Sequence, residues 1–307
     1  MGWNLYTITF KVKSPIHIGY HKVMHLYKTR LYIPAKPLWG ALTAKLTRLL
    51  NLTNYEDVGE FLKKSIRFGY LYIYDGNNII IPKYTDLGLK FGDISKVEFE
   101  KRFIGSFTST SIDSFTFTAE EGMLHEIEFI KPYEGVNKPV FLKGLLWIRE
   151  YSYIDFTIQK DNNDFIIMYN KKEFKFSDLL KNLQIGGERK YGFGLIVLDR
   201  FERASKKLAE YGFFGEWIDS KNSNDVLLKL GKDEYIWSHV QYNPHLKIKG
   251  YIEPIVGRDW SDKGAGRKLQ FYGLCWAPGS KILEDRIFKV TENFGIWVAD
   301  NHSQTSP

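Results

Sequence analysis

The sequence contains almost no cysteine: among its 307 residues, Cys275 is the only one. An internal disulfide and a cysteine-rich zinc site are therefore excluded, and a lone thiol is typical of the reducing cytoplasm. No stretch of about 18 residues stays apolar, as a membrane-spanning helix would require. The first residues, MGWNLYTITF, lack the basic region and apolar core of a secretory signal. We therefore expect a cytoplasmic protein with no membrane partner.

Acidic residues are missing from the start of the chain. The first Asp or Glu is Glu56, and eight basic residues precede it: Lys11, Lys13, Lys22, Lys28, Arg30, Lys36, Lys45 and Arg48. The whole chain has 43 Lys and Arg against 36 Asp and Glu, which gives a formal net charge of +7. This clustered positive charge indicates a polyanionic partner.

The apolar residues, 44% of the chain, are sufficient to build a core, and their spacing predicts the elements around it. Residues 5–18 alternate as in a half-buried strand, and leucines recur at helical spacing from Pro37 to Asn51. Strands are predicted at 66–74 and 78–82, joined by a turn at 75–77. Further strands at 124–130 and 145–159, a short helix at 177–183 and a strand at 191–198 follow.

This order of elements predicts an α+β fold. Residues 1–200 are expected to form a ferredoxin-like (RRM-like) β-α-β-β-α-β core with insertions. Residues 201–299 are expected to form a second, smaller α+β unit, with a helix at 202–211 and strands at 237–256, 270–276 and 288–298. We place the boundary near Phe201 and predict a disordered tail over residues 300–307.

Four glycines fall within the nine residues 186–194, between the predicted short helix and the next strand. They are Gly186, Gly187, Gly192 and Gly194. Glycine lets the backbone adopt positive φ and approach a ligand closely, while Arg189 and Lys190 add charge that attracts phosphate. Tyr191 and Phe193 either stack on bases or face the core. A turn needed only for packing is the alternative, and the order helix, glycines, strand is the reverse of nucleotide-binding motifs.

Two further motifs lie near the amino terminus. Ser-Pro-Ile-His-Ile-Gly at 14–19 ends the first predicted strand and is followed by a basic loop over 20–31. Ile-Pro-Ala-Lys-Pro-Leu-Trp-Gly-Ala-Leu at 33–42 opens the first helix, where backbone amides and Lys36 form a natural phosphate site. For His17, which has apolar neighbours, a packed and hydrogen-bonded role is the alternative to chemistry.

Together these motifs resemble the RAMP superfamily of type III CRISPR complexes. The pattern continues with Ser-Ile-Asp at 111–113 and Thr-Ala-Glu-Glu-Gly-Met-Leu at 118–124, and its order matches over residues 5–201. The resemblance implies a core that binds the guide RNA backbone, a glycine loop that touches RNA or supports the fold beside it, and an RNA-facing protrusion. The positions implied to bind RNA are His17, Gly19, Lys36, Asp113 and residues 186–194.

The sequence also departs from the family pattern. Ala35-Lys36-Pro37 and Trp39 stand where many relatives have Gly-Ser-Ser and a basic residue, so the contacts at the helix start must differ. Target-cleaving members use an aspartate with a divalent metal in the loop after His-Ile-Gly. Residues 20–31 contain no carboxylate, so we expect no metal, no cofactor and no target cleavage by this chain.

A third basic segment, residues 257–268, is predicted to form a mobile, glycine-rich loop with one large aromatic residue, Trp260. It resembles a feature of the larger, two-unit members, including those that hold one end of the guide RNA, and a solvated surface turn is the alternative. Its basic members, together with those of the loop 20–31, complete the predicted RNA contacts: Arg258, Arg267, Lys268, Lys22, Lys28 and Arg30.

The sequence thus predicts a non-catalytic guide RNA-binding subunit of a type III CRISPR RNA-guided antiviral effector complex. Its expected partners are the guide RNA, the target RNA and the other subunits. One alternative is a metal-independent endoribonuclease of the same superfamily, in which His17, His21 or His25 assists attack by a 2′-hydroxyl on precursor guide RNA. Another is a basic RNA-binding protein of two ferredoxin-like units outside the family.

Overall fold

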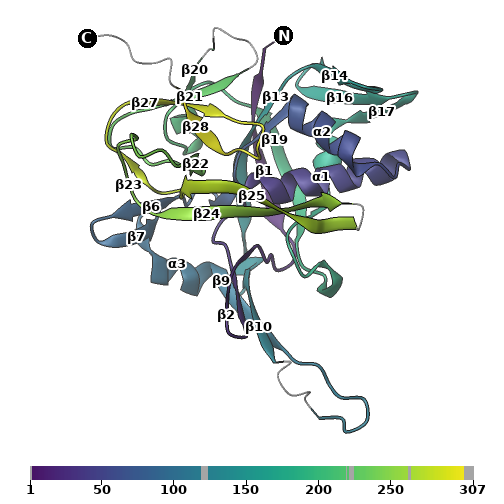
Figure 1. Cartoon of the computed structure of the whole chain (residues 1–307), viewed down its shortest axis with the longest axis vertical. Coiled ribbons are helices and arrows are strands. Elements are labelled where there is room, and N and C mark those ends of the chain that lie inside the picture. Colours follow the sequence, from purple (N-terminus) through teal and green to yellow (C-terminus); the bar gives the residue numbers. More distant parts are fainter. Residues whose placement is uncertain (1, 119–123, 219, 221–224, 262–263, 301–307) are drawn as a thin grey trace.

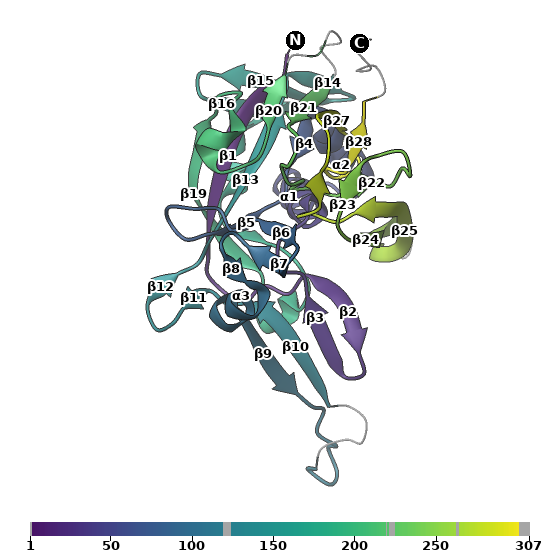
Figure 2. The same cartoon turned by 90° about the vertical axis from the view of Figure 1, so that its left-hand side faces the viewer.

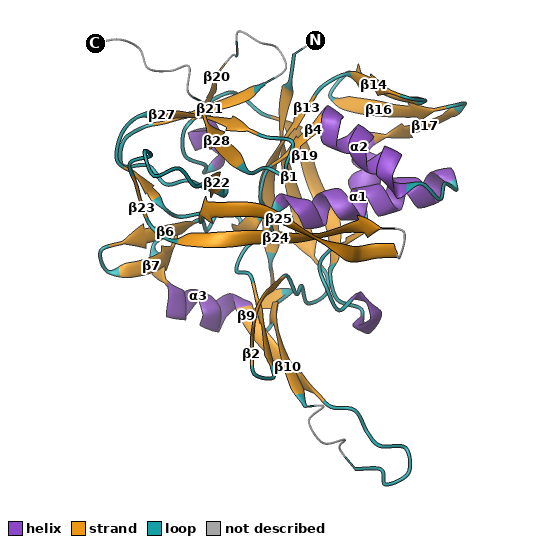
Figure 3. Cartoon of the chain, in the orientation of Figure 1, coloured by secondary structure: helices purple, strands orange, loops and turns teal. Residues whose placement is uncertain are grey.

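The computed structural model describes residues 2–118, 124–218, 220, 225–261 and 264–300. Within these residues strands predominate over helices (Figure 3). The helices are α1 (Ala35–Leu50), α2 (Tyr55–Ser65), α3 (Lys96–Phe103), α4 (Phe176–Leu180) and the short 3-10 helices η1 (Arg189–Tyr191) and η2 (Leu208–Tyr211). The protein is therefore α+β, as predicted.

The central sheet has six strands, and every pair of neighbours is antiparallel. In spatial order they are β18 (Leu183–Gln184), β19 (Leu195–Arg203), β1 (Asn4–Val12), β13 (Phe141–Ile148) and then β4 (Ile66–Phe68) and β5 (Tyr72–Tyr74), which both pair with β13. α1 lies between β1 and β4 in the chain, and α4 between β13 and β19. This is the strand and helix order of a β-α-β-β-α-β ferredoxin-like core.

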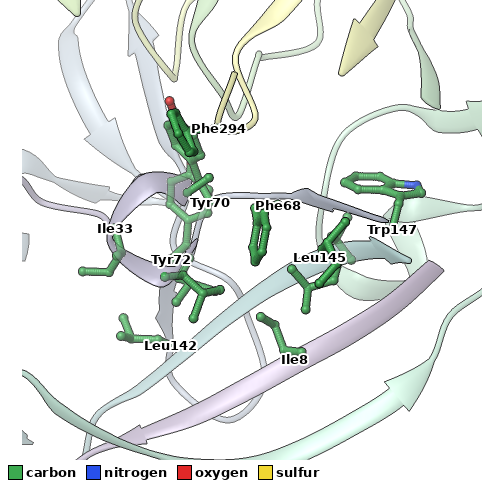
Figure 4. Packing of buried hydrophobic residues seen from close by; sticks show 14 of the residues in the cluster. Ile8, Ile33, Phe68, Tyr70, Tyr72, Leu142, Leu145, Trp147 and Phe294 are labelled. Atoms are coloured by element: carbon green, nitrogen blue, oxygen red, sulfur yellow. The ribbon is translucent and has the colours of Figure 1, made fainter. Parts of the chain in front are cut away.

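Both faces of this sheet are covered. On one face, α1 buries the predicted stripe of Leu38, Leu42 and Leu46. On the other, Trp147 of β13 stacks on Trp237 from the second half of the chain, with ring centroids 6.3 Å apart. Figure 4 shows Trp147 in this core together with Ile8 of β1. β1 is therefore buried on both faces. The alternation of residues 5–18 predicted instead a half-exposed strand, and one that is longer than β1.

A second sheet extends away from the body and forms the tapering lower end of the molecule in Figure 1. Its strands are β2 (Gly19–Val23), β3 (Leu26–Thr29), β10 (His125–Ile130) and β9 (Ile104–Ser109). The predicted basic loop over 20–31 is thus mainly a β-hairpin, whose second strand runs parallel to β10. We call the part of the chain from β9 to β10 the protrusion.

Smaller insertions surround these two sheets. One, packed near α2, contains β14 (Tyr151–Tyr153), β15 (Phe156–Asp161), β16 (Asp164–Tyr169) and β17 (Lys172–Lys175). The remaining short strands are β6 (Pro82–Thr85), β7 (Gly88–Phe91), β8 (Ile94–Ser95), β11 (Tyr133–Glu134), β12 (Lys138–Pro139), β23 (Ile248–Lys249) and β26 (Lys281–Ile282). The predicted strand 145–159 is therefore split among β13, β14 and β15. The turn predicted at 75–77 is present, and in it Asp75 N donates to Asn78 O.

The second half forms a seven-stranded sheet. Its spatial order is β20 (Glu216–Ile218), β21 (Val226–Leu230), β27 (Arg286–Val290), β28 (Trp297–Ala299), β22 (Val240–Gln241), β25 (Gly264–Trp276) and β24 (Ile252–Ser261). Figure 2 shows the long β24–β25 hairpin beside α1. Among the described residues after 201 there is no α-helix, so the expectation of a second α+β unit was wrong.

Several predicted elements differ from the structure for the same physical reason, long-range strand pairing. The predicted helix 202–211 is instead the end of β19, where Glu202 pairs with Thr7 of β1, followed by η2. The segment 257–268 was predicted to be a mobile loop, but its described residues are strand, paired between β24 and β25. The boundary near Phe201 falls inside β19 and stays a prediction. Of the predicted tail, residues 301–307 lie outside the described residues.

Candidate RNA interface

The glycine loop is anchored on the segment that contains His17. Gly187 N donates to His17 O (2.9 Å), and Gly194 N donates to Pro15 O (2.7 Å). Gly186 and Gly194 have φ of +80° and +90°, and a Cβ atom on either would overlap a carbonyl oxygen, of His17 and Ile185 respectively. The glycines at these two positions are therefore required by the packing of this loop.

His17 supports this junction. Its side chain is 7% exposed, and Nδ1 lies 2.7 Å from the carbonyl oxygen of Glu128 on β10, to which it donates. The imidazole edge lies beside Gly187, where an added Cβ atom would stand 3.3 Å from His17 Cδ2. His17 thus joins the glycine loop to the protrusion, as the packed and hydrogen-bonded alternative describes.

The side chains of the loop divide into two groups. Arg189, Lys190 and Tyr191 form η1 and are exposed, with Tyr191 64% accessible. Phe193 is 8% exposed and packs edge-to-face on Phe129, with centroids 5.6 Å apart. Phe193 therefore faces the core, the second of the two roles that the sequence left open for it, because its ring is already covered.

The β2–β3 hairpin adds polar groups next to this loop. Gly19 and Lys22 are exposed, and Lys22 Nζ lies 4.8 Å from the ring centroid of Tyr27. Lys28 is partly exposed and forms a 3.7 Å ion pair with Glu128. His21 and His25 are exposed on the same hairpin.

Two predicted RNA-contacting cations are instead engaged in internal ion pairs. Arg30 donates two hydrogen bonds to the carboxylate of Glu253 (3.0 and 3.1 Å). Lys36 donates to Asp259 Oδ1 (2.5 Å) and to the hydroxyl of Tyr272 (2.6 Å). Burial lowers the pKa of Lys36, and Asp259 opposes this shift. Both cations fasten the first half to the β24–β25 hairpin, and their contact with RNA stays a prediction.

Asp113 lies in the segment between β9 and β10 and stabilises its own turn. Its Oδ1 accepts hydrogen bonds from the amides of Phe115 and Thr116 (both 2.8 Å). These bonds, led by that of Thr116, lower the pKa of Asp113. Part of the motif at 118–124, residues 119–123, lies outside the described residues. Asp113 thus has a local structural role in its own turn.

The basic residues of the β24–β25 hairpin form a separate surface. Arg258, Arg267 and Lys268 are exposed, and Arg258 Nη1 donates to Gly266 O (3.2 Å). Trp260 stacks on Tyr55 of α2, with centroids 4.8 Å apart. The hairpin is thus tied to α2 and α1, and its charged side chains do not join the cluster around the glycine loop.

The sequence patterns did not predict two places where basic side chains lie near a candidate site or a cleft. Lys13, exposed, lies at the base of the glycine loop, because its backbone N donates to Leu195 O (2.9 Å). Arg67 and Arg149 both contact the ring of Trp3, and the two arginines line a cleft elsewhere in the fold. A signal for Lys13 was present in the acid-free start of the chain, whereas no local pattern connects the other three.

Among the residues that the structure describes, no group of three or more His, Cys, Asp or Glu side chains is arranged to hold a metal ion. None of the helices in those same residues has the length and apolar character needed to cross a membrane.

The central sheet, the glycine loop and the protrusion define a ferredoxin-like protein of the kind expected from the motifs. The chain belongs to the RAMP superfamily, whose family model matches residues 9–197. The expected family is therefore confirmed. No curated protein matches this sequence.

Solved structures with a similar fold come from type III-B assemblies. A chain in the cryo-EM structure of the Type III-B Cmr-beta bound to cognate target RNA and AMPPnP has a TM-score of 0.53 at 13% identity, covering 90% of this chain and 85% of that one. A chain of the same assembly bound to cognate target RNA has a TM-score of 0.48 at 13% identity, with coverage of 90% and 86%. At 13% identity, the first of these two likenesses shows the fold alone.

Proposed function

We propose that this chain is a non-catalytic, guide RNA-binding subunit of a type III CRISPR effector complex, with the guide RNA, its target RNA and neighbouring subunits as partners. The observation that carries the proposal is the glycine loop. Its backbone is fixed against His17, while Arg189, Lys190 and Tyr191 are exposed on its outer side. Phosphate neutralisation by the cations and stacking on Tyr191 would bind an RNA strand without reading its sequence.

Family membership and the similar fold in the Cmr-beta structure support the assembly partners of this proposal. The non-catalytic role is supported by His17, whose Nδ1 donates to a backbone carbonyl and whose ring is packed between glycines. The lone, buried thiol of Cys275 is compatible with a cytoplasmic location.

A double variant tests the loop directly. Arg189→Ala with Lys190→Ala should weaken binding of single-stranded RNA by about 1 to 3 kcal/mol, the scale of lost charge-assisted hydrogen bonds, and leave Tm unchanged. Lys160→Ala with Lys171→Ala is the matched control, because it removes the same charge from exposed positions on the β14–β17 insertion. Equal losses in the two double variants, or early unfolding with normal binding by the folded fraction, would contradict the proposal.

Purification from cells that carry the whole system tests the remaining part. The chain should co-purify with partner subunits and with bound RNA of uniform length. A free monomer that cuts precursor hairpins without metal, and loses this activity when His21 or His25 is replaced by Ala, would instead establish the endoribonuclease alternative. These two histidines, exposed together on the β2–β3 hairpin, are the observation that keeps that alternative testable.

A further inference from the structure

A charged cleft lies where the end of α2, β4 and the end of β13 meet the second half of the chain. In Figure 1, α2 and β13 lie in the upper part of the molecule, away from the protrusion. Its volume is about 950 Å³. Four cationic side chains line it: Lys64, Arg67, Arg149 and Lys289. They come from α2, β4, the residue after β13, and β27, so only folding brings them together.

Arg67 is the innermost of these cations. The residue is 7% exposed, and its Nη1 donates to Lys63 O (2.8 Å) at the end of α2. Its Nε is buried and has no acceptor among the described residues, none of which forms an ion pair with Arg67. Burial, followed by the charge of Arg149, lowers the pKa of Arg67 to about 10. A negative group in contact with Arg67 would relieve both effects.

Arg149 lies close to Arg67 against the same indole. The guanidinium carbons of both arginines lie 4.8 Å from the ring of Trp3. Arg149 Nε donates to Lys64 O (3.0 Å), so each arginine caps one carbonyl at the end of α2. Trp147 pairs with Arg67 between neighbouring strands of the sheet. The indole N–H groups of Trp3 and Trp147 are also buried without an acceptor among the described residues. Hydrogen-bond donors are thus in excess around the cleft.

The acidic side chains of the cleft do not remove this excess. Glu292 pairs with Lys64 (3.1 Å), and Asp225 pairs with Lys289 (2.6 Å). Glu150 accepts a hydrogen bond from the backbone N of Lys160 (3.2 Å). Glu292 and Asp225 also act on Arg67 and oppose the fall in its pKa, but their ion pairs are with the two lysines. Four cations thus face three carboxylates in the lining of the cleft.

We propose that this cleft binds a phosphate group, carried by a free nucleotide or by the phosphorylated end of an RNA. A guanidinium presents parallel N–H donors that match two phosphate oxygens. Arg67 and Arg149 together can therefore engage more than two oxygens, whereas a carboxylate has only two. The anion also offsets the repulsion between the two arginines. This site is separate from the glycine loop and does not depend on the function proposed above.

Thermal unfolding of the full chain in rising inorganic phosphate, against chloride at equal ionic strength, tests the site. Tm should rise saturably with phosphate, as expected for a ligand of the native state. Arg67→Met should weaken phosphate binding at least about tenfold, and it should fold, because Met fills a similar volume and removes a desolvated charge. The Arg189→Ala, Lys190→Ala double variant is the control and should keep the full response.

Other ligands identify the source of the phosphate. Tighter binding of a nucleoside monophosphate than of inorganic phosphate, lost in Arg67→Met, assigns the cleft to free nucleotides. A gain of affinity from a 5′-phosphate over a 5′-hydroxyl on the same short RNA, also lost in Arg67→Met, assigns it to an RNA end.

The absence of a saturable phosphate response in the native chain, or an equal response in Arg67→Met, overturns the proposal. If Arg67→Met does not fold, Lys64→Gln at the rim serves instead, and it should weaken phosphate binding about threefold, the scale of a partly exposed charge contact.

Discussion

Replacing Glu253 with Gln should destabilise the protein strongly, because Glu253 is the centre of a buried polar network that joins its two halves. The residue is 5% exposed on β24. Its carboxylate accepts two hydrogen bonds from Arg30 (3.0 and 3.1 Å) and one from His239 Nε2 (2.8 Å). His239 Nδ1 in turn lies 2.6 Å from the hydroxyl of Tyr70. Arg30 and Tyr70 come from the first half of the chain, and Glu253 and His239 from the second.

Two arguments give a similar magnitude for the loss. Gln removes the counter-charge and leaves the buried guanidinium of Arg30 uncompensated, which typically costs about 3 to 5 kcal/mol. The second argument uses the pKa of Glu253. Burial alone would raise it, but the hydrogen bond from His239 and the charge of Arg30 outweigh burial and lower it from 4.5 to about 2. A shift of this size corresponds to about 3 kcal/mol of stability at neutral pH.

The effect should depend on pH with a definite sign. The pKa of folded Glu253 lies below its unfolded value, so the unfolded chain takes up this proton first. The stability from Glu253 is therefore complete above about pH 4.5 and is lost as the pH falls toward about 2. Burial also lowers the pKa of His239 from 6.5, so the native protein begins to lose stability below about pH 6.5 for the same reason.

Urea unfolding of native and Glu253→Gln protein between pH 7 and pH 3 measures these terms. The difference in the free energy of unfolding should be largest near pH 7 and should shrink below about pH 4.5. Adding Arg30→Met to Glu253→Gln should restore part of the loss, because the unpaired charge is removed. Asp86→Asn, which breaks the exposed pair of Asp86 with Lys249, is the control and should change stability little. A loss no larger than that of the control, or one independent of pH, would refute the reasoning.

Three further predictions concern the glycine loop. Gly194→Ala should destabilise by at least about 2 kcal/mol more than Gly192→Ala in chemical unfolding, because both have positive φ but only Gly194 would place a Cβ against a carbonyl oxygen; equal losses would show that backbone strain alone matters. Phe193→Ala should cost about 3 to 5 kcal/mol of stability, whereas Tyr191→Ala should leave Tm unchanged and weaken RNA binding by about 1 to 3 kcal/mol; the reverse assignment would put the aromatic contact on Phe193. RNA affinity measured by titration should fall steeply with salt and should not respond to a metal chelator, and an affinity constant over a threefold change in salt would exclude phosphate contacts.

Local patterns were sufficient for elements whose signals lie within a few residues. The leucine spacing of α1, the turn at 75–78 and the glycine loop were all predicted near their observed positions. Two helices were missed although local signals for them exist. Asn54 caps α2 by accepting from the amides of Glu56 and Asp57, and Ser95 caps α3 by accepting from the amide of Glu98. Both helices are short and weakly apolar, so capping was the clearer signal.

Which basic residues remain accessible to RNA depends on groups that are distant in sequence. Arg30 and Lys36 each meet a carboxylate 223 residues away, and this neutralises charges that the acid-free start of the chain predicted to be available to a ligand. The cleft around Arg67 likewise requires side chains from separate strands and a helix. Composition reports the number of charges in a segment, but their burial and pairing arise only when the chain packs, because desolvation and ion pairing depend on distances in space.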